Sequence, residues 1–224
     1  MIPWVLLDIA RVSSDEEELR LYQRGREFSI RVGSHELMNS RAHGSEEALG
    51  ELACARIADR PRPRVLIGGL GMGYTLKAAL RGLSAQGQVI VAELIPAVVA
   101  WNRGPLGNLA GYPLRDGRVI VREDDIANIL RAEQRAYDAI LLDVDNGPKG
   151  LTRNGNDWLY GQAGLSAAFV ALRPGGVLAV WSAGPDQAFS QRLRKTGFEV
   201  EEVRARARGA RGGARHTIWI AVSA

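Results

Sequence analysis

The stretch that decides the fold is VLIGGLGMGYTL, residues 65–76. Its first three residues predict a short buried strand, and the residues after the glycines predict a helix over 75–83. Glycines between a strand and a helix let the chain turn tightly and let a ligand approach the backbone. The turn therefore predicts a binding site for a nucleotide-like molecule. The glycines that we assign to this site are Gly69, Gly71 and Gly73.

An acidic residue supports this interpretation of the turn. Glu93 ends the next apolar run, 20 residues after Gly73. At that place a carboxylate accepts hydrogen bonds from two ribose hydroxyls of an adenosine ligand. A dinucleotide is disfavoured, because Tyr74 stands where the dinucleotide motif has its third glycine. We therefore expect Glu93 to bind the ribose of an adenosyl cofactor.

Short apolar runs alternate with helical patterns along this part of the chain. The runs lie at 65–67, 89–92, 119–121, 139–142 and 177–180. This alternation predicts an α/β fold with a parallel sheet covered on both faces. The last two strand-like segments, 198–203 and 216–222, are joined without room for a crossover helix, so they should pair antiparallel. A Rossmann-like sheet closed by such a hairpin resembles the S-adenosylmethionine (SAM)-dependent methyltransferases.

The N-terminal part of the chain follows another pattern. Apolar and polar residues alternate over 19–21 and 28–32, on either side of a glycine-containing turn. This alternation predicts a hairpin with one buried face, and the apolar run 4–10 predicts a further strand. We expect a small antiparallel β-sheet over 1–44, followed by the Rossmann-like SAM-binding catalytic domain over 45–224.

The composition is that of an ordinary globular chain, with 46% hydrophobic and 24% charged residues among 224. No apolar run approaches the roughly 20 residues of a membrane span. The N-terminus also lacks the basic and apolar regions of a secretory signal. We therefore predict no membrane association and a cytoplasmic location. The single cysteine, Cys54, has no partner for an internal disulfide.

The net charge of +4 raises the question of nucleic-acid binding. Five arginines gather at 204–215, but no aromatic residues stand between them for base stacking. We therefore predict a solvated loop there, and we do not expect nucleic acid as a partner. The three histidines are scattered without ligand spacing, so we predict no metal site.

Acidic residues also follow the third and fourth strands. Ligands of open α/β sheets bind beyond the carboxyl ends of the strands, so these acids should line one cleft with Glu93. Asp125 is the first candidate for the adenine amino group, and Asp124 stays open as the alternative. Whichever of the two is not the ligand would stabilise the N-terminus of the following helix.

Asp143 ends the fourth strand, beside the point where strand order reverses in such sheets. Alkyl transfer from a sulfonium needs an uncharged nucleophile in line and a group that accepts the proton of that nucleophile. Asp143 is the candidate for that catalytic role. The alternative is an aspartate that only caps the loop after the strand.

With these motifs, the sequence resembles the spermidine synthases, which are polyamine aminopropyltransferases, over nearly the whole chain. The resemblance implies SAM or decarboxylated SAM as cofactor and a small-molecule amine, such as a polyamine, as acceptor. It also implies that Glu93 binds ribose, Asp125 contacts adenine and Asp143 deprotonates the amine. The segments that carry the resemblance are 65–76, 92–96, 137–143, 159–160 and 172–178.

Two positions depart from the family pattern. Met72 stands where the family has an aspartate that meets the amino group of the aminopropyl arm. Asn146 stands where the family has its second aspartate, and Asp145 lies one residue earlier. A polycation is costly to bind in a desolvated site without paired carboxylates. Since a thioether does not repel the carboxylate of SAM, SAM and decarboxylated SAM are both candidate cofactors.

Three functions therefore stay open: a spermidine-synthase-like transferase, a SAM-dependent methyltransferase of a small molecule, and an inactive binding protein with this fold. The sequence also leaves the oligomeric state open, a homodimer included. Trp158 belongs either to a substrate wall or to the core. The residues that we assign to the acceptor are Asp145, Asn146, Trp158 and Tyr160.

Overall fold

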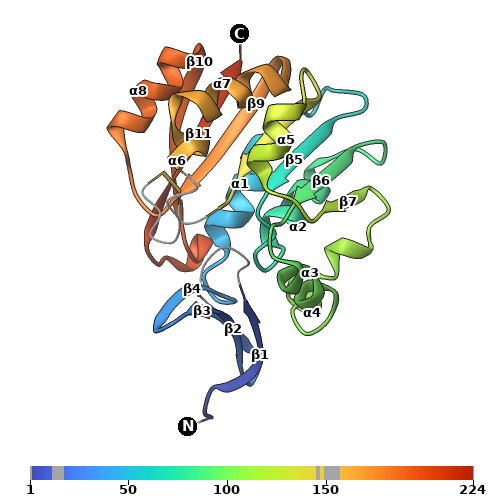
Figure 1. The fold of residues 1–224 in the computed structure, drawn as a ribbon, viewed down its shortest axis with the longest axis vertical. Helices are drawn as coiled ribbons and strands as arrows, with labels where there is room; N and C mark the ends of the chain where they lie inside the picture. Colours follow the sequence, from blue (N-terminus) through green and yellow to red (C-terminus); the bar gives the residue numbers. More distant parts are fainter. Residues whose placement is uncertain (1, 12–17, 145–146, 149–156, 224) are drawn as a thin grey trace.

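Two β-sheets form the framework of the molecule (Figure 1). The computed structural model describes residues 2–11, 18–144, 147–148 and 157–223. The first sheet contains β1 (Val5–Arg11), β2 (Glu18–Arg24), β3 (Glu27–Val32) and β4 (His35–Asn39). The second contains β5 (Arg64–Gly68), β6 (Gln88–Ala92), β7 (Val119–Arg122), β8 (Tyr137–Leu142), β9 (Leu172–Ser182), β10 (Phe198–Arg206) and β11 (Arg215–Ser223).

The second sheet has the order β10-β11-β9-β8-β5-β6-β7. Strands β5 to β9 run parallel, whereas β11 pairs antiparallel with both β9 and β10. The chain order reverses between β5 and β8, because β6 and β7 follow on one side and β9 on the other. The predicted Rossmann-like sheet with a C-terminal antiparallel hairpin is confirmed.

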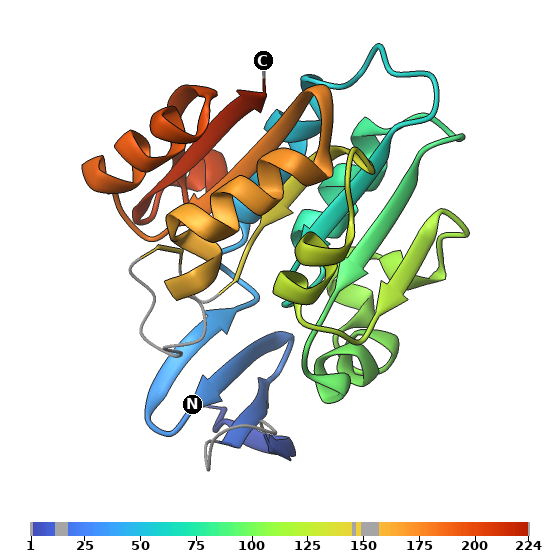
Figure 2. The same ribbon diagram turned by 45° about the horizontal axis from the view of Figure 1, so that its top comes forward.

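Helices cover both faces of this sheet (Figure 2). Alternate strand residues face opposite sides, so Ile67 packs in one buried cluster with α1 and α2, and Leu66 packs in another with α5, α7 and α8. The helices are α1 (Gly44–Ala55), α2 (Tyr74–Gly82), α3 (Pro96–Arg103), α4 (Gly107–Ala110), α5 (Ile126–Ala132), α6 (Asp157–Tyr160), α7 (Gln162–Ala171) and α8 (Gln187–Thr196), with short 3₁₀ turns η1 (Pro113–Arg115) and η3 (Gly209–Arg211). Among the described helices, none has the length and apolar character that crossing a membrane requires.

The N-terminal sheet has the order β1-β2-β3-β4, with antiparallel neighbours throughout. Leu21 and Ile30 are almost fully buried on one face and belong to the same cluster as Ile67 of β5. The sequence predicted the small sheet but not the strand β4. The domain boundary expected at residue 44 stays a prediction, since one buried cluster contains residues from both sides of it.

The C-terminal hairpin is longer than the sequence indicated. Strand β10 continues to Arg206 and β11 begins at Arg215, and Ala205 and Ala207 are buried beneath the arginines. The backbone N–H of Gly44 donates to the carbonyl of Ala207 at 2.7 Å, which ties the start of α1 to this hairpin. The arginine side chains themselves are exposed, as expected. The prediction of a solvated loop over the whole of 204–215 is therefore wrong for its ends, because 204–206 and Arg215 belong to strands and two alanines between the first arginines are buried.

Candidate functional site

The glycine turn joins β5 to α2 at the carboxyl edge of the parallel strands. Gly69, Gly71 and Gly73 have φ values of 87°, 51° and 82°, which residues with side chains rarely adopt. A Cβ on Gly69 would lie 2.6 Å from the carbonyl oxygen of Asp143, and one on Gly71 would lie 3.2 Å from the sulfur of Met38. Both the backbone conformation and the close neighbours therefore require glycine here.

Glu93 lies against this turn, as its position in the sequence predicted. Its side chain is buried, and the residue is 7% exposed. One carboxylate oxygen accepts from the N–H of Leu70 at 2.9 Å, and the other accepts from the N–H of Ile95 at 2.9 Å. The ribose-binding role of Glu93 stays a prediction.

The two aspartates after β7 have different surroundings. Asp125 is the N-cap of α5, and its Oδ1 accepts from the N–H of Ala127 at 2.8 Å. Asp124 accepts from the Asn128 side chain at 3.0 Å and faces Arg122 at 3.4 Å. The pKa of Asp124 lies below its ordinary value, and the hydrogen bond from Asn128 is the largest cause.

This difference favours Asp125 as the adenine candidate. Among the described residues, no donor meets Asp125 Oδ2, whereas both oxygens of Asp124 have partners. Asp125 therefore caps the helix with one oxygen, and its other oxygen has no donor among the described residues. The choice between the two aspartates stays a prediction.

Asp143 follows β8 directly, at the place where strand order reverses. The hydroxyl of Thr75 donates to Asp143 Oδ2 at 2.7 Å. Burial raises the pKa of Asp143 from 3.8 to about 6, and the Thr75 hydrogen bond opposes that rise. A carboxylate with such a pKa is mostly ionised at neutral pH and is a stronger base than an ordinary aspartate.

Glu46, in the first turn of α1, is a second carboxyl group in this region that the sequence did not single out. The pKa of Glu46 lies well above its ordinary value, first because of burial and then because of the negative charges of Asp143 and Glu47. The Thr75 hydroxyl, which donates to Asp143, also lies 3.2 Å from the backbone carbonyl oxygen of Glu46, so the two residues are close together. We refer to Asp143 and Glu46 as the carboxyl pair.

The neighbouring acid Glu47 differs from Glu46 in having partners. Lys77 lies 3.6 Å and the imidazole of His43 lies 3.3 Å from the carboxylate of Glu47. No hydrogen bond or ion pair joins the Glu46 carboxylate to any of the described residues. The carboxyl pair is therefore a region of uncompensated negative charge when both groups are ionised.

The predicted acceptor residues are only partly described. Tyr160 is 4% exposed, and its hydroxyl donates to the carbonyl of Val144 at 2.9 Å. This contact anchors the segment that follows β8, so the role of Tyr160 toward an acceptor stays a prediction. The half-buried ring of Trp158 lies under the guanidinium of Arg131, 3.9 Å from the ring centroid. The other two candidates, Asp145 and Asn146, lie outside the described residues.

Met72 is 1% exposed and belongs to the apolar cluster beneath the turn. Where the family pattern has an aspartate, this chain therefore has a neutral side chain that packs in the core. Within the part of the chain that the structure describes, no three His, Cys, Asp or Glu side chains are grouped as a metal ion would require.

The sequence matches no protein-family model and no curated protein. The structure, in contrast, is similar to solved spermidine synthases. For the enzyme from Thermotoga maritima, the TM-score is 0.77 at 17% identity, over 98% of this chain and 73% of that chain. A spermidine synthase in complex with the transition-state analogue AdoDATO gives 0.76 at 17% identity, over 98% and 72%.

A third structure, a probable spermidine synthase from Corynebacterium glutamicum ATCC 13032, gives a TM-score of 0.65 at 16% identity, over 98% of this chain and 79% of that chain. The chain therefore has a spermidine-synthase-like fold. This finding confirms, for the fold, the resemblance that the sequence motifs indicated.

Proposed function

We propose that the protein is a transferase that binds SAM or decarboxylated SAM at the glycine turn and moves an alkyl group, the aminopropyl group of decarboxylated SAM, to an amine acceptor. The observation that carries this proposal is Asp143, a carboxyl group of raised pKa that meets the glycine turn where strand order reverses. The similarity to three structures named as spermidine synthases supports the aminopropyl group in particular.

The residues at the turn fit an adenosyl group. Gly69 and Gly71 keep the backbone of the turn free of side chains, and Glu93 presents a buried carboxylate beside it. The free oxygen of Asp125 lies at the end of β7, the strand that pairs with β6, whose carboxyl end Glu93 follows. A bound sulfonium cofactor would supply an electrophilic carbon and a neutral thioether as leaving group.

The role of Asp143 follows from the proton balance of the reaction. The acceptor nitrogen must be uncharged to attack carbon, and it carries an extra proton once the new C–N bond forms and the C–S bond breaks. Asp143 accepts a proton from the amine and later releases it to water. A pKa of about 6 suits both steps near neutral pH, because the carboxylate is ionised yet basic enough to hold the proton.

Glu46 adds a second carboxyl group to the same region. Met72 is neutral, so the turn itself offers no carboxylate to a cationic ligand. The charge of Asp143 raises the pKa of Glu46, so the two groups interact, and Glu46 has no cation of the described chain beside it. An ammonium group near the carboxyl pair would lower this repulsion and would be bound for that reason.

Methyl transfer from SAM is the second candidate, and Met72 is the observation that favours it. The neutral, buried side chain of Met72 does not repel the SAM carboxylate. Aminopropyl transfer releases methylthioadenosine, whereas methyl transfer releases S-adenosylhomocysteine, so the two reactions leave different nucleoside products.

The test incubates the protein with decarboxylated SAM or SAM and a panel of mono-, di- and triamines, and measures both nucleosides. We expect amine-dependent methylthioadenosine from decarboxylated SAM, and its loss in Asp143→Asn. S-adenosylhomocysteine from SAM would instead establish the second candidate. A folded protein that binds a cofactor but yields neither nucleoside would contradict both transfer reactions. It would indicate a binding protein without catalytic activity.

A further inference from the structure

A small cavity lies beside the segment that connects β6 to β7, near α3 and α4 in Figure 1. Its volume is about 200 Å³, which suits a small molecule, since pockets for drug-sized ligands have about 300–1,000 Å³. None of the residues that line it belongs to the sites assigned to the cofactor or the acceptor. The lining residues are Asn102, Arg103, Tyr112, Leu114 and Arg115.

The charge of this cavity is positive and uncompensated. Arg103 and Arg115 are the charged residues of its lining, and neither side chain forms an ion pair or a hydrogen bond with any of the described residues. The acid next to Arg115 in the chain, Asp116, is already engaged, because Arg118 donates to its two oxygens at 2.8 Å and 3.0 Å. Guanidinium groups match the oxygens of phosphate and carboxylate in geometry. Two unpaired arginines at one cavity therefore attract an anion.

Tyr112 forms a wall of the cavity in a strained backbone conformation. Its φ of 56° is positive, and among the described residues other than glycine only Arg135 shares this feature. The N–H of Tyr112 donates to the carbonyl of Gly107 at 2.7 Å, and a Cβ on Gly107 would lie 2.5 Å from the tyrosine ring. The guanidinium of Arg115 lies 4.1 Å from the centroid of that ring. Strain persists only where surrounding contacts enforce it, and it clusters at ligand sites. The wall is therefore held in place by the chain.

Asn102 connects this cavity to the glycine turn. It is 1% exposed, and its Nδ2 donates to the carbonyl of Gly71 at 2.8 Å. A Cβ on Gly73 would lie 3.0 Å from Oδ1 of Asn102, so the same side chain fills the space behind the turn. That Oδ1 is buried and has no hydrogen-bond partner among the described residues. A buried acceptor without a donor is costly, so an anion that carries a hydroxyl group suits this wall better than one without.

We propose that this cavity is a binding site for a small oxyanion such as hydrogen phosphate, and that an anion bound there tightens cofactor binding at the glycine turn. An anion between Arg103 and Arg115 would hold the end of α3 and the 3₁₀ turn η1 together. The segment between these two elements packs behind Gly73 through Asn102 and Pro113. A ligand that fixes this segment also fixes the turn, so each site raises the affinity of the other.

The surroundings of the cavity favour a small anion over a macromolecule. Nucleic acid and anionic lipid surfaces draw on positive charge that is spread over a wide area. The next arginines along the chain are paired with acids, Arg118 with Asp116 at 2.8 Å and Arg122 with Asp124 at 3.4 Å. The unpaired positive charge of this segment is therefore confined to the cavity, where one small ion can reach both guanidinium groups.

The first experiment titrates inorganic phosphate into the protein by calorimetry near neutral pH, with sodium chloride holding every solution at one ionic strength. We expect one phosphate per chain. Arg103→Gln and Arg115→Gln should each weaken its binding about 10–100-fold, because each removes a hydrogen bond to a charged group. Circular dichroism checks that the variants are folded, and either variant carries the test if the other fails to fold.

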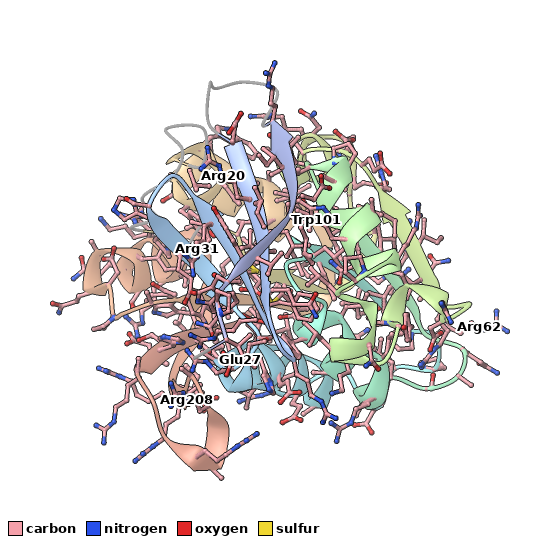
Figure 3. All side chains as sticks on the ribbon, turned by 90° about the horizontal axis from the view of Figure 1, so that it is seen from below. Arg20, Glu27, Arg31, Arg62, Trp101 and Arg208 are labelled. Atoms are coloured by element: carbon pink, nitrogen blue, oxygen red, sulfur yellow. The ribbon has the colours of Figure 1, made fainter. Side chains whose placement is uncertain are left out.

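Arg62→Gln is the matched control and should bind phosphate like wild type. Arg62 is also an exposed arginine without an ion pair among the described residues. It precedes β5, at the amino edge of the parallel strands, whereas the cavity lies behind the glycine turn at their carboxyl edge. Figure 3 shows Arg62 at the rim of the molecule, away from Trp101 of α3.

The second experiment titrates methylthioadenosine with and without phosphate. We expect phosphate to lower the dissociation constant of methylthioadenosine about 5-fold or more in wild type and Arg62→Gln, and to leave it unchanged in Arg115→Gln at the same phosphate concentration. This coupling rests on the proposed function, whereas the phosphate titration alone tests the anion site. A protein that binds phosphate at the cavity but no methylthioadenosine would contradict the proposed function and support the anion site.

Three results would overturn the anion site. They are a folded wild type without saturable phosphate binding at millimolar concentrations, equal phosphate binding in wild type and the two cavity variants, and equal weakening by all three substitutions. Displacement of phosphate by methylthioadenosine would place the anion at the glycine turn and would also overturn it. A methylthioadenosine affinity that phosphate does not change would overturn the coupling.

Discussion

Replacing Asp143 by asparagine should stabilise the protein at neutral and alkaline pH while it lowers turnover. The folded state holds the Asp143 proton more tightly than the unfolded chain, because burial raises the pKa from 3.8 to about 6. Between these pKa values the folded state binds more protons, so the free energy of unfolding of wild type falls as the pH rises through this window. Well below pH 3.8 the wild-type carboxyl is neutral in both states and this loss is absent.

The size of the effect follows from the shift in pKa. A rise of about two units at about 1.36 kcal/mol per unit gives about 3 kcal/mol as an upper limit, since the carboxyl is only partly shielded from water. Asparagine keeps the size of the side chain and an acceptor for the Thr75 hydroxyl but has no charge to desolvate. The variant should therefore gain up to about 3 kcal/mol over wild type between pH 4 and pH 8.

The assay is urea unfolding followed by circular dichroism, at intervals from pH 4 to pH 8. Asp138→Asn, in the strand that Asp143 follows, is the control, because Asp138 is 1% exposed but accepts from Arg173 at 2.7 Å. Its loss leaves an arginine without its partner, so that variant should be less stable than wild type at neutral pH. A difference between Asp143→Asn and wild type that is the same at pH 4 and pH 8 would refute the reasoning. In the proposed reaction Asp143→Asn should also lower turnover by about 10²–10⁴-fold.

Three further substitutions test the rest of the site. Glu93→Ala should weaken binding of SAM and methylthioadenosine by about 1.5–3 kcal/mol in calorimetry, and unchanged affinity in a folded variant would remove Glu93 from the site. The charge of Asp143 raises the pKa of Glu46, so Glu46 should keep its proton while Asp143 titrates, and Glu46→Gln should leave the acidic limb of the kcat/KM profile in place; a limb that moves to lower pH would show that Glu46 ionises first. Met72→Asp should shift the ratio of the two dissociation constants toward decarboxylated SAM and lower stability, because it buries a carboxylate; an unchanged ratio would place Met72 away from the cofactor.

The positions of the residues expected to bind the cofactor could be predicted from the sequence, because they depend on the order of strands and helices along the chain. A strand, a glycine turn and a helix are consecutive at 65–76, and the carboxyl ends of parallel strands meet at one edge. That rule alone brings Glu93 and Asp143 to the turn, as the structure shows. The positive φ values of the three glycines are likewise a local requirement.

Glu46 could not be found in the same way, because its place depends on how two helices pack. A Cβ on Gly50 of α1 would lie 2.8 Å from Ala78 of α2, so this glycine lets the helices approach closely. The approach brings the start of α1 next to Thr75 and Asp143. In the sequence, Glu46 has only the ordinary signature of an acid in a first helical turn. Gly50 within a helix was the available signal of close packing.

The buried position of Tyr160 was also beyond the sequence pattern. Its hydroxyl contacts a backbone carbonyl 16 residues earlier, and its ring meets Phe189 edge to face at 5.9 Å between centroids. Neither contact has a periodic signature, since each joins elements that are distant in the chain. Strand β4 was missed for a similar reason, because its residues are only half-buried or exposed and do not alternate in polarity.

The most direct test of the central claim is calorimetric titration of the wild type with SAM, decarboxylated SAM and methylthioadenosine in parallel. If the glycine turn and Glu93 form an adenosyl site, at least one of these ligands should bind to a single site. Its dissociation constant should fall in the range of about 1 μM to 1 mM that is usual for enzyme substrates, and Glu93→Ala should weaken it. A folded wild type that binds none of the three ligands would contradict the account.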